Sequence, residues 1–259
     1  MTEGTATRAL RAGKLRLRRS LLDAALRHTP AQERRELALG ELPADDPQVR
    51  ELVIERFNQL YYDEGRAGGT WHRTSWLGVT VWKCPLDLWV YQELLHRLRP
   101  DLVIETGTAF GGSALYLGTV CDALDHGRVV SVDIAPQPDL PVHPRVEFVT
   151  GSSTDPGIVA DLGARAAAAQ TVLVILDSDH SEKHVRAELD AYGPMVTPGS
   201  YLVVEDTNVN GHPVYPEHGP GPYEAVESFL AETDGYVRDA DCEKYHLTFN
   251  PAGWLRRVR

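Results

Sequence analysis

The sequence predicts an α/β domain in which a mostly parallel β-sheet is covered by helices on both faces. Short runs rich in Val, Ile and Leu recur along the chain, and they are too short and too β-branched to form helices. Segments of helical length and glycine-containing turns lie between these runs. Such alternation is typical of a parallel sheet, because each parallel connection needs a crossover that is usually a helix.

The expected elements follow one another regularly along the chain. The strands predicted to build the sheet are 102–106, 128–133, 145–149, 171–177 and 200–205. The helices predicted around them are 86–98, 112–124, 156–169 and 182–195. In the tail we expect a helix around Phe229–Leu230 and two further strands at Tyr236–Asp239 and Tyr245–Phe249.

The residues before the sheet predict a helical extension. Helices are expected over 8–27, 31–39 and 46–64. The apolar face predicted for the last of these contains Leu52, Val53, Phe57, Leu60 and Tyr61. Residues 1–70 are therefore assigned to an N-terminal helical extension, and residues 71–259 to the α/β domain.

Three tryptophans lie close together near the start of the α/β domain. They are Trp71, Trp76 and Trp82. Aromatic side chains serve both in packing and in ligand sites. A hydrophobic cover or subunit contact and a pocket roof are therefore equally good interpretations of this segment.

The composition argues against two classes of partner. The chain carries 26 Lys and Arg against 37 Asp and Glu, which gives a formal net charge of −11. Nucleic acids and anionic membranes are themselves negative, so neither is an expected partner. The charge is uneven, because residues 1–19 hold six basic residues and one acid. A solvated tail is the preferred interpretation of this basic arm, and phosphate binding or contact with an acidic neighbouring subunit are the alternatives.

Cysteine usage and hydropathy indicate a cytoplasmic protein. The three cysteines, Cys84, Cys121 and Cys242, are few and odd in number, so we expect reduced thiols. No apolar run approaches transmembrane length, and the basic N-terminus lacks the apolar core of a signal peptide. We predict a cytoplasmic homo-oligomer that acts on a small molecule.

Carboxylates follow two of the predicted strands directly. The run 171–176 ends at Asp177, and the run 201–204 ends at Glu205 and Asp206. Because ligands bind at the carboxyl ends of parallel strands, these three acids are expected to meet at one edge of the sheet. Three like charges there favour a bound cation, and hard oxygen ligands favour Mg²⁺. The alternative is that one acid caps a helix and the others are solvated.

A glycine turn follows the first predicted sheet strand. This segment contains Glu105, Gly107, Gly111 and Gly112, but it does not match the dinucleotide fingerprint G-x-G-x-x-G. The second strand ends at Asp133, which is well placed to accept hydrogen bonds from ribose hydroxyls. The turn, this acid and the distal carboxylates together predict a nucleoside-containing cofactor beside a metal.

Several motifs in the same order resemble the cephalosporin hydroxylase and rhamnosyl O-methyltransferase family, over about Trp76 to Val258. They are Lys83-x-Pro-x-Asp-Leu-Trp-x-Tyr91, Ile104-Glu-Thr-Gly-Thr-x-x-Gly-Gly-Ser113, Leu176-Asp-Ser-Asp-His180, Gly199-Ser-Tyr-Leu-Val-Val-Glu-Asp-Thr207, Gly219-Pro-Gly-Pro222 and Leu247-Thr-Phe-Asn-Pro251. The resemblance implies a Rossmann-like class I methyltransferase fold with a mostly parallel seven-stranded sheet. It also implies bound S-adenosylmethionine and Mg²⁺, and methyl transfer to oxygen. The expected acceptor is a rhamnose-like sugar or a related natural product of secondary metabolism, as in antibiotic biosynthesis.

The candidate cofactor-binding residues come from these motifs and from the loop after the third strand. They are Lys83, Glu105, Gly107, Ser113, Asp133, Ser152 and Ser153. Ser152 or Ser153 is expected at the adenine edge, and a helix N-cap at Ser153 or Thr154 is at least as good an interpretation. Lys83 is expected to bind the methionine carboxylate or to pair with Asp87.

The candidate general base is His180, because a neutral imidazole beside the predicted metal can take the proton of the acceptor hydroxyl. Its alternative role is a helix cap or a structural hydrogen bond. Asp179 is assigned as a reserve metal ligand or as the residue that orients His180. The expected metal ligands are Asp177, Glu205 and Asp206. A Mg²⁺ ion held by them can fix the acceptor hydroxyl and lower its pKa.

A long irregular segment, 207–222, starts directly after the metal carboxylates. Loops of this length in compact domains are often functional lids. His212, Tyr215 and His218 are therefore predicted to face the acceptor, and a surface excursion is the alternative.

Two other functions compete with methyl transfer. An iron-dependent hydroxylase needs two histidines and one carboxylate, of which His180-x-Glu182 supplies a part. A non-catalytic binding module on the same fold would not need the full set of candidate catalytic residues.

Overall fold

The structure of this protein is a computed structural model that describes residues 47–259. The chain divides into two compact units, Met1–Val53 and Ile54–Arg259. The helices expected over 8–27 and 31–39 and the basic arm lie outside the described residues. The second unit holds the sheet and all the candidate site residues, and the boundary predicted at residue 70 stays a prediction.

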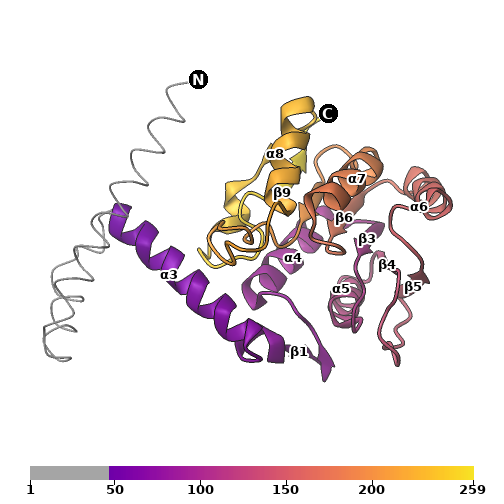
Figure 1. Ribbon diagram of the computed structural model, residues 1–259. Coiled ribbons are helices and arrows are strands. Elements are labelled where there is room, and N and C mark those ends of the chain that lie inside the picture. Colours follow the sequence, from indigo (N-terminus) through magenta and orange to yellow (C-terminus); the bar gives the residue numbers. More distant parts are fainter. Residues whose placement is uncertain (1–46) are drawn as a thin grey trace, which may run out of the picture. The chain divides into compact units, whose positions relative to one another are not determined.

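The second unit is built on a seven-stranded sheet with the order β5-β4-β3-β6-β7-β9-β8 (Figure 1). The strands are β3 (Leu102–Thr106), β4 (Arg128–Asp133), β5 (Val146–Thr150), β6 (Val172–Leu176), β7 (Tyr201–Val204), β8 (Tyr236–Arg238) and β9 (Trp254–Arg257). The five strands β3 to β7 are parallel, and β9 joins them antiparallel between β7 and β8. The predicted mostly parallel seven-stranded sheet is confirmed.

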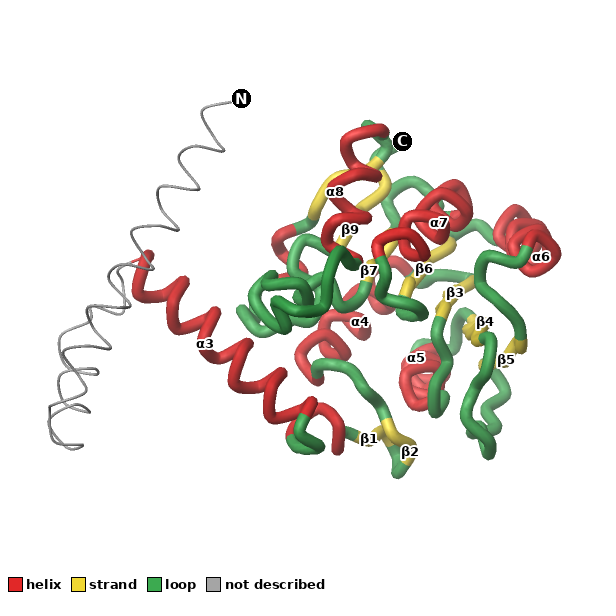
Figure 2. The backbone as a smooth tube through the Cα atoms, in the orientation of Figure 1, coloured by secondary structure: helices red, strands yellow, loops and turns green. Residues whose placement is uncertain are grey.

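Helices cover both faces of this sheet (Figure 2). They are α4 (Pro85–Leu98), α5 (Gly112–Ala123), α6 (Pro156–Ala168), α7 (Glu182–Tyr192) and α8 (Pro222–Glu232). A two-stranded hairpin, β1 (Ser75–Trp76) with β2 (Val79–Thr80), precedes α4. Three short 3₁₀ turns lie at Thr70–Arg73, Gly193–Met195 and Ala240–Glu243.

The two faces of the sheet bury different residues because side chains alternate along a strand. Ile104 and Val174 point into one core cluster, which also contains residues of α6, α7 and α8. Val103 and Leu173 point into the other, which contains residues of α4 and α5. Both faces are thus apolar, as expected for a parallel sheet that is covered on each side.

The last predicted strand was placed wrongly. Tyr245–Phe249 does not pair with the sheet, and the strand is β9 at Trp254–Arg257. The backbone of Phe249 has other partners: its N–H donates to the Asp87 carboxylate at 2.8 Å, and its C=O accepts from the Asn208 N–H. Phe249 belongs instead to a small apolar cluster with Tyr62.

The helix α3 (Pro47–Arg66) confirms the helix expected over 46–64, but only part of its apolar face, since Leu52 and Tyr61 are partly buried and the other three members are exposed. Phe57 and Leu60 are 51% and 58% exposed, and Val53 is exposed as well. Within the second unit, the face that α3 buries contains Asn58 and Tyr62. The amide of Asn58 is accommodated because it donates to the backbone carbonyls of Ile54 and His246.

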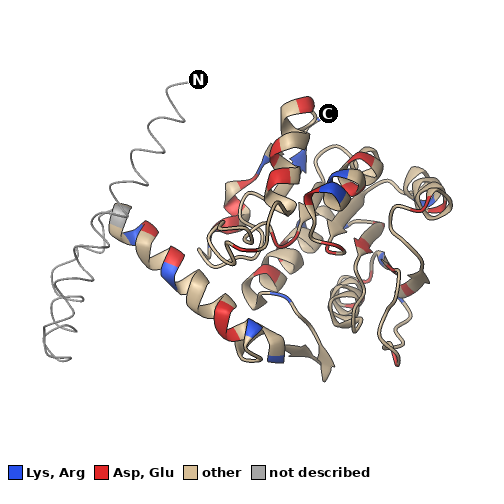
Figure 3. Ribbon diagram, viewed as in Figure 1, with Lys and Arg blue, Asp and Glu red and all other residues tan. Residues whose placement is uncertain are grey.

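The surface of the second unit carries charges of both signs, as α7 and α8 show in Figure 3. Arg186 of α7 pairs with Asp190 on its own helix and with Glu232 of α8. The three cysteines are buried and free, in agreement with the expected reduced thiols. Along 47–259, we find no helix that combines the length and the apolar character needed to cross a membrane.

Candidate active site

A cavity of about 810 Å³ opens at the carboxyl ends of the parallel strands. Its lining comes from the loops that follow β3, β4, β5, β6 and β7, together with residues that precede α4. The volume is in the range of small-molecule sites, and the position is the one that open α/β sheets use for ligands. Most of the predicted site residues line it, and Glu105, Glu205 and His212 do not.

The glycine turn after β3 brings two loops into close contact. Gly107 has a φ of +85°, and a Cβ at this position would lie 1.7 Å from the backbone oxygen of Asp177. No other residue fits, since both the conformation and the space exclude a side chain. The turn therefore sits directly against the loop that carries the first metal candidate.

Asp133 closes β4 and holds the same turn from the other side. One carboxylate oxygen accepts hydrogen bonds from the backbone N–H groups of Thr108 and Ala109, at 2.8 and 3.0 Å. The second oxygen accepts from Ala135 N–H at 2.8 Å. A carboxylate offers about four lone-pair positions, so the second oxygen can also accept a bond from a ribose hydroxyl.

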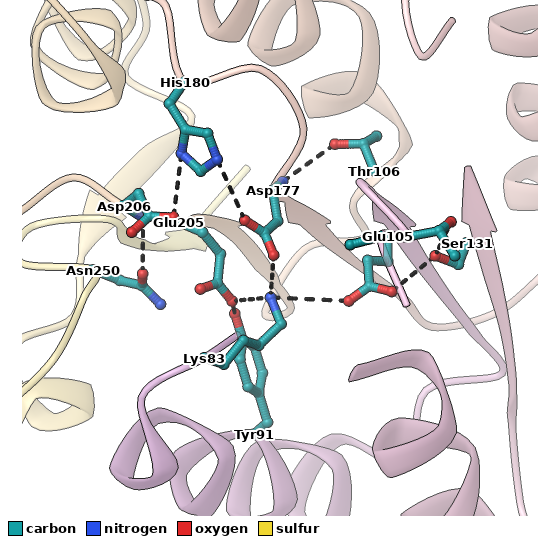
Figure 4. A network of polar contacts seen from close by, with 12 residues as sticks. Lys83, Tyr91, Glu105, Thr106, Ser131, Asp177, His180, Glu205, Asp206 and Asn250 are labelled. Atoms are coloured by element: carbon teal, nitrogen blue, oxygen red, sulfur yellow. Dashed lines mark hydrogen bonds and ion pairs between the residues drawn. The ribbon is translucent and has the colours of Figure 1, made fainter. Parts of the chain in front are cut away.

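A buried ammonium group, that of Lys83, lies among the carboxylates at the edge of the cavity, as Figure 4 shows. Lys83 Nζ donates to Asp177 Oδ2 at 2.6 Å and to Glu205 Oε1 at 2.8 Å, and it lies 3.9 Å from Glu105 Oε1. Burial alone would lower the pKa of Lys83, but the carboxylates of Asp177 and Glu205 outweigh it and raise the pKa. Lys83 therefore remains charged, and its amine pairs with protein carboxylates. Of its two expected roles, the pairing with Asp87 is not seen, and binding of a methionine carboxylate stays a prediction.

Glu105 is fully buried at the end of β3. Its Oε2 accepts a hydrogen bond from the Ser131 hydroxyl at 2.8 Å, whereas Oε1 has no hydrogen-bond partner among residues 47–259. Burial raises the pKa of Glu105 to about 7, against the opposing attraction of Lys83 and a hydrogen bond from Ser113. Ser113, at the start of α5, thus contacts both Glu105 and the cavity.

A second group of polar side chains faces the cavity. Asp177, His180 and Asp206 offer ligand atoms that all lie within 4.8 Å of one another. His180 Nδ1 is 3.2 Å from Asp206 Oδ2, and its Nε2 is 3.9 Å from Asp177 Oδ1 (Figure 4). Burial lowers the pKa of His180, but the carboxylates of Asp206 and Asp177 reverse this and raise it.

Glu205 takes a different direction from its neighbour Asp206. Its Oε1 accepts hydrogen bonds from Lys83 Nζ and from the Tyr91 hydroxyl, the latter at 2.5 Å. Asp206 turns toward the cavity because it adopts a left-handed backbone conformation with a φ of +55°. The structure therefore brings two of the three predicted metal ligands together with His180 and places Glu205 behind them.

Asp179 lies at the start of α7. Its Oδ1 accepts a hydrogen bond from the Ser181 N–H at 2.8 Å, and hydrogen bonds to Ser181 lower the pKa of its carboxyl. The carboxylate that contacts His180 is Asp206 and not Asp179. Orientation of His180 by Asp179 is therefore not what the structure shows.

The loop after β5 reaches the cavity through Ser152 and Ser153. The Ser152 hydroxyl contacts Thr154 at 3.1 Å, and Ser153 Oγ lies 3.1 Å from His184 Nε2. The side chain that caps α6 is Asp155, which accepts from Gly157 N–H and Ile158 N–H. The alternative of an N-cap at Ser153 or Thr154 is therefore wrong.

Figure 2 shows the segment between β7 and α8 as an irregular loop. Tyr215 and His218 line the cavity. The Tyr215 ring carries the Arg66 guanidinium at 3.6 Å from its centroid. His212 does not face the cavity, because its Nε2 lies 2.8 Å from Glu224 Oε1 and its ring stacks on Tyr223.

Aromatic side chains form part of the cavity wall. Trp71 packs against Tyr62 and Phe249, with ring centroids 5.5 and 5.7 Å away. Trp82 contacts Phe110. Trp71 and Trp82 therefore belong to the pocket roof, whereas Trp76 lies in the core, where its indole N–H contacts Thr119. The sequence did not reveal Tyr62 and Phe249, since their roles depend on long-range packing.

Comparison with known proteins assigns the family. The model of the rhamnosyl O-methyltransferase/CmcI family matches residues 69–258. The chain belongs to this family. A rhamnosyl O-methyltransferase of Mycobacterium tuberculosis is 41% identical over 214 residues, which cover 80% of this chain and 86% of that protein. The corresponding protein of Mycobacterium leprae is 40% identical over 211 residues, or 79% and 90% of the two chains.

Solved structures agree on the fold. An apo structure of the N160 form of CmcI has a TM-score of 0.56 at 20% identity and covers 72% of this chain and 76% of that one. A structure of the D160 form with Mg and SAM has a TM-score of 0.55 at 19% identity, with 72% and 77% covered. The predicted family and the class I methyltransferase fold are confirmed.

Proposed function

We propose that this protein transfers a methyl group from S-adenosylmethionine to a hydroxyl of a rhamnose-like sugar or a related natural product, with Mg²⁺ at the acceptor. The observation that carries this proposal is the group of Asp177, His180 and Asp206 at the edge of a methyltransferase sheet. It joins metal-binding carboxylates to a basic side chain within one cavity.

The enzyme class rests on family membership, which makes the chain an S-adenosylmethionine-dependent O-methyltransferase. The sugar acceptor is supported by the names of the curated relatives, which are rhamnosyl O-methyltransferases. The D160 form of CmcI contains Mg and SAM, which supports the same cofactors here. A cytoplasmic location, a homo-oligomer and a role in natural-product biosynthesis stay predictions from the sequence.

The residues of the cavity fit a magnesium ion. Asp177 and Asp206 present carboxylate oxygens to the cavity, and such hard ligands suit Mg²⁺. Glu205 is the third proposed ligand, although here its Oε1 accepts from Lys83 and Tyr91. A bound Mg²⁺ would fix the acceptor hydroxyl and lower its pKa.

His180 is the proposed general base. Because its Nδ1 lies beside the Asp206 carboxylate, this nitrogen carries the proton of the neutral ring and Nε2 is left as the acceptor. Asp206 thus fixes both the tautomer and the direction of the ring. The proton of the acceptor hydroxyl would pass to His180 Nε2 as the oxygen attacks the methyl carbon.

The cofactor site is proposed along the glycine turn. Asp133 would accept a ribose hydroxyl bond, and Gly107 lets the backbone come close to the ligand. Ser113, Ser152 and Ser153 border the same part of the cavity. Glu105 would act from behind this wall, through Ser113.

The alternative hydroxylase fits the donor set less well. A non-haem iron site of that class uses two histidines and one carboxylate. The group found among residues 47–259 has one histidine and two carboxylates, and Glu182 does not line the cavity. The other alternative is a non-catalytic binding module. Measurable methyl transfer would exclude it, and a complete lack of turnover would favour it.

The proposal is tested by removing the metal and by offering acceptors. EDTA should abolish methyl transfer to a rhamnosylated acceptor, and Mg²⁺ should restore it. Calorimetry with S-adenosylhomocysteine should give nearly the same affinity with and without Mg²⁺, because the proposed nucleoside contacts do not involve the metal. Full turnover in the chelator would remove Asp177, Glu205 and Asp206 from the mechanism.

A further inference from the structure

A buried acid on α7 connects two serines of the cofactor cavity. Glu188 is completely buried, and its Oε1 accepts a hydrogen bond from the Ser178 hydroxyl at 2.7 Å. The same oxygen lies 3.5 Å from His184 Nε2, which in turn lies 3.1 Å from Ser153 Oγ. Ser153, Ser178 and His184 all line the cavity.

This chain of contacts has no role in holding the metal or in activating the acceptor. A glutamate on the buried face of a helix is costly unless it is paired, and here it shares that face with Val185, Leu189 and Tyr192. Its Oε2 has no hydrogen-bond partner in the part of the chain that the structure describes. Leucine or methionine would serve equally well at this position if packing were the only requirement. The buried glutamate therefore indicates a further role.

The contacts fix which way each hydroxyl can act. A carboxylate only accepts hydrogen bonds, so the Ser178 hydroxyl must give its hydrogen to Glu188 and keeps its lone pairs for another donor. For the same reason His184 Nε2 carries a hydrogen beside Glu188. The pKa of His184 is raised, chiefly by this bond to Glu188.

Ser153 has the opposite polarity. Its oxygen lies 3.1 Å from His184 Nε2 and shares the single N–H of that nitrogen with Glu188, so Ser153 accepts there and its own hydrogen is left for an acceptor. The cavity wall therefore presents an acceptor at Ser178 and a donor at Ser153. The edge of adenine offers the matching pattern, because its 6-amino group donates and its N1 accepts.

We infer that Glu188 and His184 are positioning residues that set the hydrogen-bond polarity of Ser178 and Ser153, and that this pair of hydroxyls selects adenine at the purine end of the cofactor. The inference rests on the proposed function, since it assumes that S-adenosylmethionine occupies this cavity. It assigns to α7 a role in base recognition that is separate from methyl transfer.

Two ligands that differ only at the base edge test this inference. S-inosylhomocysteine carries hypoxanthine, whose 6-oxygen accepts and whose N1–H donates, so both polarities are reversed. Calorimetry on the full chain should show S-adenosylhomocysteine binding about 10–100-fold more tightly, because the reversed edge leaves polar groups wrongly paired. Failure of the unmodified protein to bind either ligand would contradict the cofactor assignment itself.

The variant that tests Glu188 is Glu188→Gln, which keeps the shape of the side chain. The amide of Gln can donate to Ser178, so the Ser178 hydroxyl no longer has to give its hydrogen to residue 188 and can donate to the ligand. The preference for the adenine ligand should therefore fall to about threefold or less. Asp190→Asn is the matched control, because it makes the same change on an exposed position of α7 and should keep the full preference.

Ser178→Ala gives a second measurement that does not disturb the buried acid's helix. It should also reduce the preference, while the affinity for S-inosylhomocysteine changes little. The inference is overturned if the unmodified protein does not distinguish the two ligands. It is equally overturned if Glu188→Gln or Ser178→Ala binds them with the unmodified protein's ratio.

Discussion

Two clusters of charge meet at Asp177, and they differ in how the charge is balanced. In the inner cluster, Lys83 neutralises the buried carboxylates, and its Nζ lies within 2.8 Å of both Asp177 and Glu205. In the outer cluster, Asp177 Oδ1 and Asp206 Oδ2 lie beside a half-buried imidazole, that of His180. The negative charge of the inner cluster is thus balanced by the ammonium group of Lys83.

Asp177 belongs to both clusters through different oxygens. Its Oδ2 is held by Lys83, and its Oδ1 lies toward His180 and the cavity. A buried ion pair restrains the geometry of its members even where it adds little stability. We therefore propose that the inner cluster positions Asp177 and that methyl transfer takes place at the outer cluster.

The largest effect is expected at the outer cluster. His180→Ala should lower kcat by about 10²–10⁴-fold, which is the usual contribution of a positioned proton acceptor. The KM for the acceptor and the affinity for S-adenosylhomocysteine should change little, because the loss falls on the transition state. His126→Ala, which removes an imidazole paired with Asp101 at the surface, is the control. A near-normal rate with Mg²⁺ present would leave the metal as the sole activating group.

At the inner cluster the expected effect is on folding. Lys83→Met removes the ammonium and leaves buried carboxylates unpaired, which costs about 3–5 kcal/mol in the free energy of unfolding. Denaturant unfolding without metal measures the loss. Lys244→Met is the matched control, because Lys244 pairs with Glu93 at the surface. The denaturant midpoint of this variant should hardly differ from that of the unmodified protein. Equal midpoints for the two variants would show that Lys83 does not stabilise the cluster.

The sequence was sufficient for the sheet because each core strand carries its own signal. The run before Asp177 is apolar on both faces, and only a covered parallel strand accommodates it. The same logic placed Asp177 and Asp206 at one edge. The final strand was missed because the backbone of Phe249 binds Asp87 and Asn208, and no local pattern shows such distant partners.

The site was predicted less well wherever side-chain direction decides the role. Glu205 and Asp206 are adjacent in sequence, yet one faces Lys83 and the other faces His180. Tyr91 donates a hydrogen bond to Glu205, and the sequence offered one signal for this role, because Tyr91 belongs to the same motif as Lys83. Glu188 was detectable as an acid on the buried face of α7, but its link to Ser178 needed coordinates.

The inner cluster can be probed further through pH. Burial raises the pKa of Glu105 from 4.5 to about 7, so the folded protein binds a proton that the unfolded chain has released. Stability from this group is present below about pH 4.5 and is lost as the pH rises to about 7. Over that window Glu105→Gln should gain up to about 3 kcal/mol relative to the unmodified protein.

Glu147→Gln provides the control of opposite sign. A hydrogen bond from Arg165 lowers the pKa of Glu147, so its contribution is lost as the pH falls and not as it rises. Unfolding curves measured from below pH 4.5 up to about pH 7 compare the variants, because the Glu147 contribution changes below this window and the Glu105 contribution changes within it. A constant difference between Glu105→Gln and the unmodified protein would mean that Glu105 is ionised throughout.

The smallest effect is expected on the cofactor side of the outer cluster. Asp133→Ala removes the proposed ribose acceptor, and a lost hydrogen bond to a charged group costs about 1.5–3 kcal/mol of S-adenosylhomocysteine binding. The carboxylate also holds the N–H groups of Thr108 and Ala109, so part of the loss comes from the loosened turn. Asp133→Asn separates the two causes, because its amide oxygen can keep the contacts with Thr108 and Ala109, whereas an NH2 group replaces the oxygen that would accept from the ribose hydroxyl. Asp161→Ala on the exposed face of α6 is the control. Unchanged affinity in Asp133→Ala would place the ribose elsewhere in the cavity.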